Sequence, residues 1–95
     1  MAGQVAPVEC GQTTVRGQTR VILSRIDQLL ADAGTTKHKL LSASVWLADI
    51  RTFDEMNLAW NDWIPAAEPP ARATVEARLA LPSYLVEIAV VAAIE

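Results

Sequence analysis

The chain has 95 residues, of which 52% are hydrophobic and 20% are charged, and its formal net charge is −3. This length predicts a single domain over residues 1–95, and the composition is typical of a folded core rather than a disordered segment. The negative charge argues against nucleic acid or an anionic membrane as the main partner. A structural zinc site is not expected, because Cys10 and His38 are the only cysteine and histidine.

The sequence also carries information about compartment. A single cysteine fits a reducing environment, and MAGQVAPVECGQ lacks the basic and apolar regions of a signal peptide. The longest apolar stretch, LVEIAVVAAI, is interrupted by Glu87 and is too short to span a bilayer. We therefore expect a soluble, cytoplasmic protein with no membrane partner.

The first half of the chain predicts a strand, a helix and a second strand. Residues 2–6 are a candidate strand that ends at Pro7. Apolar residues then recur at helical spacing over 15–33, with Thr13 or Thr14 as the candidate N-cap and Gly34 at the C-terminal end. The next segment, LLSASVWLAD, predicts a strand with two different faces. Its apolar face carries Leu41, Ala43, Val45 and Leu47, and its other face carries Ser42, Ser44 and Trp46.

The second half predicts a helix and two further strands. Thr52-Phe-Asp-Glu55 matches a capping box, in which the threonine and glutamate side chains satisfy each other's backbone amides. Pro69 and Pro70 begin an extended segment, and a turn within LALPSYL divides it into two strands. The predicted order is β-α-β-α-β-β. Pro65 ends the second predicted helix. The apolar residues at helical spacing in this helix are Phe53, Met56, Trp60 and Trp63.

We expect the last two strands to pair as a hairpin, with Leu79 opposite Tyr84. In this register one face is uniformly apolar and receives both helices, while the other face carries the charges. Arg72 and Glu87 then point away from the helices together, about 13 Å apart, a gap that suits a small ligand. Glu76 becomes a near neighbour of Glu87 on that face. Because two helices cannot cover both faces, we expect the open face to be a contact between subunits.

Several stretches resemble the RidA/YjgF family. They are GQVA at residues 3–6, GQTRVILSRIDQLLADAG, LLSASVWLADI, FDEMNLAW and PPARATVEARL…YLVEIAVVAA, and they follow in the family's order over nearly the whole chain. The resemblance implies an α/β (α+β) chorismate mutase-like fold with two helices on one face of the sheet. It implies a homotrimer with ligand sites in the clefts between subunits. It further implies cofactor-free hydrolysis of reactive 2-imino acids, or their enamine tautomers, to 2-keto acids and ammonia.

The resemblance assigns roles to particular residues. The family arginine falls on Arg72, which would hold the substrate carboxylate by a bidentate pair. The family acid falls on Glu87, which would orient or deprotonate the attacking water. Gly3 and Gln4 match a segment whose backbone borders the substrate pocket. Thr74 stands where the family often has cysteine, and it either lines the pocket or reflects strand propensity.

The chain also differs from the family in places. Asn57 matches a family asparagine with a structural role. The family usually has an upstream strand pair with a tyrosine near the pocket, whereas the only tyrosine of this chain, Tyr84, lies elsewhere. We expect a small 2-imino or 2-keto acid as the ligand, and neither cofactor nor metal. Two alternatives stay open: a non-catalytic carboxylate-binding or regulatory member of the family, and a structural fragment that needs another chain to complete its sheet.

Overall fold

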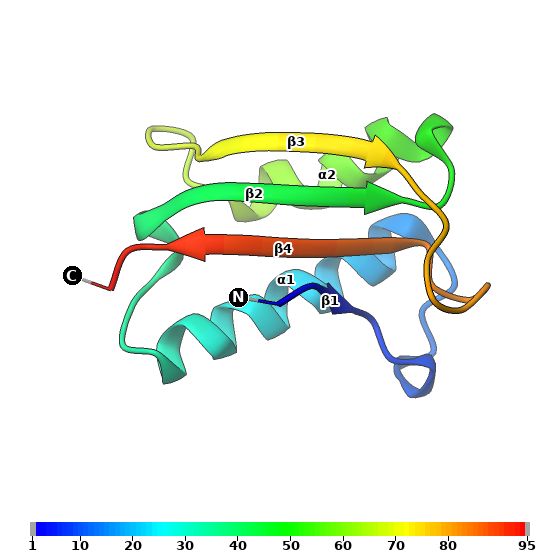
Figure 1. Ribbon diagram of the computed structural model, residues 1–95, viewed down its shortest axis with the longest axis horizontal. Helices are drawn as coiled ribbons and strands as arrows, with labels where there is room; N and C mark the ends of the chain where they lie inside the picture. The colour runs from blue at the N-terminus through cyan, green and yellow to red at the C-terminus, as the bar shows by residue number, and fades with distance from the viewer. Residues whose placement is uncertain (1, 95) are drawn as a thin grey trace.

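The computed structural model describes residues 2–94 and contains one four-stranded sheet with both helices on the same face (Figure 1). This arrangement confirms the predicted α+β fold class and the order of the six elements. Among the described residues, neither helix is long and apolar enough to cross a membrane. The strands are β1 (Gln4–Val5), β2 (Leu40–Leu47), β3 (Ala71–Glu76) and β4 (Val86–Ala92), and the helices are α1 (Val15–Asp32) and α2 (Phe53–Trp63).

The sheet has the order β1-β4-β2-β3. Strand β2 lies between the last two strands, antiparallel to β4 and parallel to β3. The predicted hairpin is therefore wrong. Residues 77–85 cross the end of β2 instead of turning tightly, and they are held there because Ala77 N donates to Leu47 O and Ala48 N donates to Leu85 O.

This register decides which side chains face the helices. On β4, Val86, Ile88 and Val90 are buried, as the sequence predicts. On β3 the predicted faces are exchanged: the even-numbered residues, which we expect on the open face, lie on the helix side. The reason is that parallel pairing with β2 places each of them directly beside a buried residue of β2, in the same row across the sheet. The helix side of β3 carries Arg72, Thr74 and Glu76, in rows with Ala43, Val45 and Leu47, and its open side carries Ala71, Ala73 and Val75.

The core lies between the sheet and the helices. A bulge between Leu40 and Ser42 shifts the alternation of β2, so that Leu40 is buried and Leu41 is 59% exposed, contrary to the expected pattern. Burying each large aliphatic side chain contributes about 1.5–3 kcal/mol. The largest side chains of this core with almost no exposed surface include Ile22, Leu23, Ile26, Leu30, Leu47, Met56 and Ile88.

The two helices begin in different ways. Thr14 caps α1, because its hydroxyl oxygen accepts from Gly17 N at 3.0 Å. The predicted capping box of α2 does not form: a short 3-10 helix, η3 (Ile50–Thr52), precedes α2, and the Thr52 hydroxyl donates to Asp49 O at 2.6 Å. Glu55 instead accepts from Arg16 N at 3.0 Å, so it satisfies an open amide of the other helix.

Gln18 connects the start of α1 to the segment that leads into β4. Its side chain is 4% exposed and makes three hydrogen bonds. Nε2 donates to Gln12 O at 3.1 Å and to Ser83 O at 2.9 Å, and Oε1 accepts from Leu85 N at 2.9 Å. One buried amide thereby satisfies three backbone groups that no strand or helix pairs.

Replacing Gln18 by leucine should lower the free energy of unfolding by about 3 kcal/mol, because it leaves those three backbone groups without a partner. Chemical denaturation measures the change. Gln28→Leu, an exposed position on the same helix, is the matched control and should change stability by less than about 0.5 kcal/mol. Equal denaturation midpoints for the two variants would contradict this account of Gln18.

Candidate functional site

Arg72 extends from edge strand β3 toward α2. Its guanidinium carbon lies 5.1 Å from the centroid of the Trp60 ring and 5.6 Å from that of Phe53. Its Nη1 lies 4.0 Å from Met56 Sδ. These three residues form one stripe of α2, because spacings of three and four residues place side chains on the same helix face.

The charge of Arg72 has no counter-ion in residues 2–94. The ion pairs of this part of the chain join Asp62 to Arg16 and Arg20, and Asp49 to Arg51. Burial lowers the pKa of the Arg72 guanidinium below its ordinary value, since the surrounding side chains do not solvate the charge. Arginine nevertheless stays protonated at neutral pH. A half-buried, uncompensated cation of this kind favours the binding of an anion.

Two oxygen atoms near this cation also lack partners. Thr74 Oγ1 and Asn57 Oδ1 are buried and make no hydrogen bond within the described residues. Thr74 follows Arg72 on the same face of β3, and Asn57 lies between Phe53 and Trp60 along the stripe of α2. Burying an unpaired polar group is costly, so these two oxygens are unsatisfied polar atoms close to the stripe of α2. The structural role expected for Asn57 stays a prediction.

Glu87 lies on the opposite, open face of the sheet. It occupies one row with Trp46 of β2 and Val5 of β1. A Cβ atom at Gly3 would collide with the Glu87 carboxylate, so the carboxylate lies directly over the Gly3 backbone. The structure thus brings together Gly3 and Glu87.

Gln4 points to the other side of β1. It pairs with Ile88, and its Oε1 accepts from Arg25 Nε of α1 at 3.0 Å while its Nε2 donates to Ala2 O. Its side chain is therefore separated from Glu87 by the sheet and from Arg72 by the full width of the sheet.

Arg72 and Glu87 do not share a face, so that expectation is wrong. They are also separated within the sheet, because β2 lies between their strands and Arg72 is three residues from the row of Glu87. Two strand spacings and three residues along a strand give about 14 Å between the backbones. The two side chains of one chain therefore cannot contact the same small molecule.

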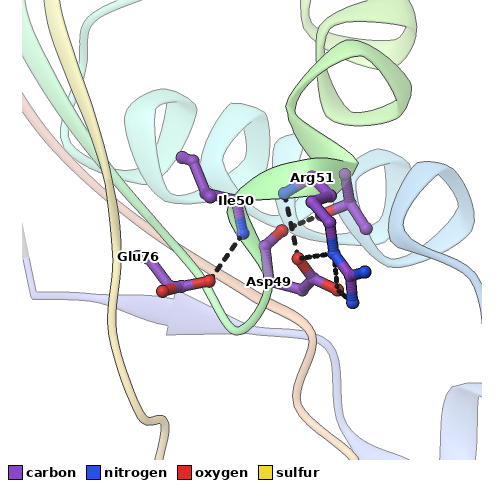
Figure 2. A network of polar contacts seen from close by, with 5 residues as sticks. Asp49, Ile50, Arg51 and Glu76 are labelled. Carbon is purple, nitrogen blue, oxygen red and sulfur yellow. Dashed lines mark hydrogen bonds and ion pairs between the residues drawn. The ribbon is translucent and has the colours of Figure 1, made fainter.

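Glu76 is not a neighbour of Glu87 either, because it lies on the helix side of β3. Figure 2 shows its carboxylate next to the turn after β2, where Oε2 accepts from Ile50 N at 3.0 Å. Asp49 Oδ1 accepts from Arg51 N at 2.9 Å, and the Arg51 guanidinium lies 2.8 Å from Asp49 Oδ2. Hydrogen bonding to Arg51 lowers the pKa of the Asp49 carboxyl. These hydrogen bonds and this ion pair stabilise the turn after β2 and the first residues of η3.

A cavity of about 550 Å³ lies beyond the end of β3, next to the loop that leads to β4. Its polar lining comes from Glu76, Arg78 and Tyr84, so the only tyrosine of the chain lies there and not beside Arg72. Within residues 2–94, no group of three His, Cys, Asp or Glu side chains is placed to hold a metal ion.

Sequence reasoning missed the surroundings of Arg72. Trp60 was expected in the core, and it is 4% exposed. The contact of both Trp60 and Phe53 with the guanidinium was not expected, because the assumed hairpin directed Arg72 away from the helices. The sequence shows that Phe53 and Trp60 are seven residues apart and therefore share one helix face. This spacing identifies them as neighbours of Arg72 only when β3 is known to lie under α2.

The sequence model of the family described as Endoribonuclease L-PSP matches residues 1–94. The chain belongs to this family. A RutC family protein of Haemophilus influenzae is 43% identical over 91 residues, which cover 96% of this chain and 78% of that protein. These names agree with the RidA/YjgF resemblance and confirm it.

Two solved structures of the family support the fold. A YjgF family protein of Neisseria meningitidis has a TM-score of 0.92 and 40% identity, covering 97% of this chain and 75% of that one. A member of the Rid protein family from Yersinia pestis has a TM-score of 0.85 and 33% identity, covering 96% of this chain and 75% of that one.

Replacing Gly3 by alanine should displace the Glu87 side chain, because the added methyl group occupies the position of the carboxylate. Carboxyl ¹³C NMR of Glu87 should report a changed environment, while stability falls by less than about 1 kcal/mol because a flexible side chain can move aside. In the Glu87→Ala background, Gly3→Ala should no longer lower stability, because the carboxylate that it displaces is absent. An unchanged Glu87 resonance in Gly3→Ala would show that the two residues do not touch.

Proposed function

We propose that this protein hydrolyses small reactive 2-imino acids, or their enamine tautomers, to 2-keto acids and ammonia, as a homotrimer with its sites between subunits. The observation that carries this proposal is the half-buried, uncompensated guanidinium of Arg72. An arginine that has no carboxylate partner among residues 2–94 is suited to bind a small carboxylate through several charge-assisted hydrogen bonds.

The separation of Arg72 and Glu87 supports a site between subunits. Since one chain places them on opposite faces, a ligand that contacts both must lie where Arg72 of one copy meets Glu87 of another. Among residues 2–94, edge strand β3 has no neighbouring strand on its outer side, so the β3 edge of the sheet is open to a second copy.

The open face is suited to contact between copies. It is weakly polar, with small side chains at its centre, and it leaves Val75 50% exposed and Val91 53% exposed. An apolar face of this kind favours burial against another subunit. The rows on this face join Ala71, Ser42 and Val91, then Ala73, Ser44 and Ala89, then Val75, Trp46, Glu87 and Val5.

The chemistry needs few groups, because an imine carbon is already electrophilic. Arg72 holds the carboxylate. Glu87 accepts a proton from water as the water oxygen bonds to C2, and the imine nitrogen takes up a proton. In the resulting carbinolamine the amine nitrogen takes up a proton and leaves as ammonia, while the hydroxyl loses a proton and the C2 carbonyl forms. Atoms balance as imino acid plus water giving keto acid plus ammonia, and positioning with Glu87 as a single proton shuttle suffices.

One observation favours the alternative of a binding protein without turnover. The uncompensated guanidinium of Arg72 lies against two aromatic rings of α2 within one chain, without Glu87. A small carboxylate could bind there as a regulatory ligand.

Turnover experiments separate these functions. With imine generated in situ by an amino-acid oxidase, the protein should accelerate keto-acid release, and Arg72→Leu and Glu87→Gln should each reduce the rate by about 100-fold or more. Arg78→Leu, an exposed arginine beyond the end of the same strand, removes an equal charge and is the control that should keep the rate. A native rate in Arg72→Leu would exclude the catalytic assignment. Stabilisation by 2-oxobutanoate without imine turnover would indicate the binding function instead.

A further inference from the structure

We propose that Phe53 and Trp60 form an aromatic clamp that positions the Arg72 guanidinium for a carboxylate ligand, with Phe53 as the residue at the entrance. This inference rests on the proposed function, because it concerns how the same cation is held. It assigns Phe53 a positioning role in binding, in addition to its place in α2.

The geometry carries this inference. The guanidinium carbon lies within 6 Å of two ring centroids, at 5.1 Å and 5.6 Å, the range in which an aromatic ring attracts a cation. Both rings come from one rigid helix face, at positions i and i+7. Arginine side chains lose much conformational freedom when they are fixed, and the two contacts restrict Arg72 before a ligand arrives. Preorganisation of this kind increases affinity by lowering the entropic cost of binding.

Aromatic rings and a carboxylate would have different effects as partners of the Arg72 guanidinium. A carboxylate beside Arg72 would hold the guanidinium equally well, but it would take up the N–H groups that a ligand needs and would cancel the charge. Aromatic rings attract the charge while offering no oxygen acceptor. The clamp therefore explains how Arg72 is held in a desolvated place without a counter-ion in the described chain. The lowered pKa caused by burial agrees with this environment.

The two rings differ in accessibility. Trp60 is 4% exposed and belongs to the core, whereas Phe53 is 38% exposed at the first position of α2. Changes at Phe53 thus alter the clamp with little loss of core packing, which makes it the residue to test. Leu58, which is 53% exposed on the same helix and outside the stripe, provides a matched apolar control.

The test replaces Phe53 by phenylalanines with one, two or three ring fluorines and measures the Kd of 2-oxobutanoate by calorimetry. Fluorine weakens the attraction of the ring for a cation while largely preserving its shape. The Kd should rise with each fluorine and should be roughly fivefold higher in Phe53→Leu than in the native protein. Phe53→Trp should bind at least as tightly as the native protein, and Leu58→Ala should be unchanged. A purely structural role for Phe53 predicts no dependence on fluorine number.

The outcomes separate this inference from the proposed function. If Arg72→Leu abolishes binding while fluorination leaves the Kd unchanged, the proposed aromatic clamp is excluded. The proposed carboxylate site at Arg72 is then still supported. If the native protein binds no 2-oxo acid, the proposed function fails and the positioning role fails with it. The geometry itself is then tested in the free protein, where Phe53→Leu should shift the Arg72 Nε–Hε NMR resonance by removing a ring current. An unshifted resonance would show that ring and guanidinium are not in contact.

Discussion

The position of β2 between β3 and β4 determines the rest of the structure. Because β3 pairs with it in parallel and β4 in antiparallel fashion, the residues of both strands are assigned to faces by a common neighbour. That assignment places Arg72 beneath α2 and Glu87 on the open face. A one-residue change of register would move every side chain of β3 to the other face. The separation of the two charged residues is therefore a property of the sheet and not of their rotamers.

The placement of Arg72 has an energetic consequence. A charge that is partly removed from water needs compensation, and residues 2–94 provide aromatic rings and a thioether sulfur but no carboxylate. The buried oxygens of Thr74 and Asn57 add further unpaired polar groups at the same place. Stability alone would favour pairing or replacing these groups. Unpaired polar groups that lower stability in this way are typical of functional sites.

The sequence predicted most of the fold, but it did not predict which side chains the sheet brings together around Arg72. Local signals succeeded where the deciding contacts are local: Thr14 caps α1, and alternation identified the buried face of β4. They failed where the deciding partner is distant in sequence. Alternation divides β3 into two faces, yet it cannot say which face meets the helices, and the assumed hairpin supplied the wrong answer for Arg72. Likewise Thr52 and Glu55 matched a capping box, but η3 and the Arg16 amide supplied other partners.

The central claim is that a complete site takes Arg72 from one subunit and Glu87 from another, and a mixing experiment tests it most directly. Arg72→Ala and Glu87→Gln protomers, each inactive alone, are unfolded and refolded together in equal amounts. In a closed ring of random composition, about a quarter of the sites receive both native residues, so the mixture should recover about a quarter of the native imine hydrolysis rate. A mixture as inactive as its components would contradict the account.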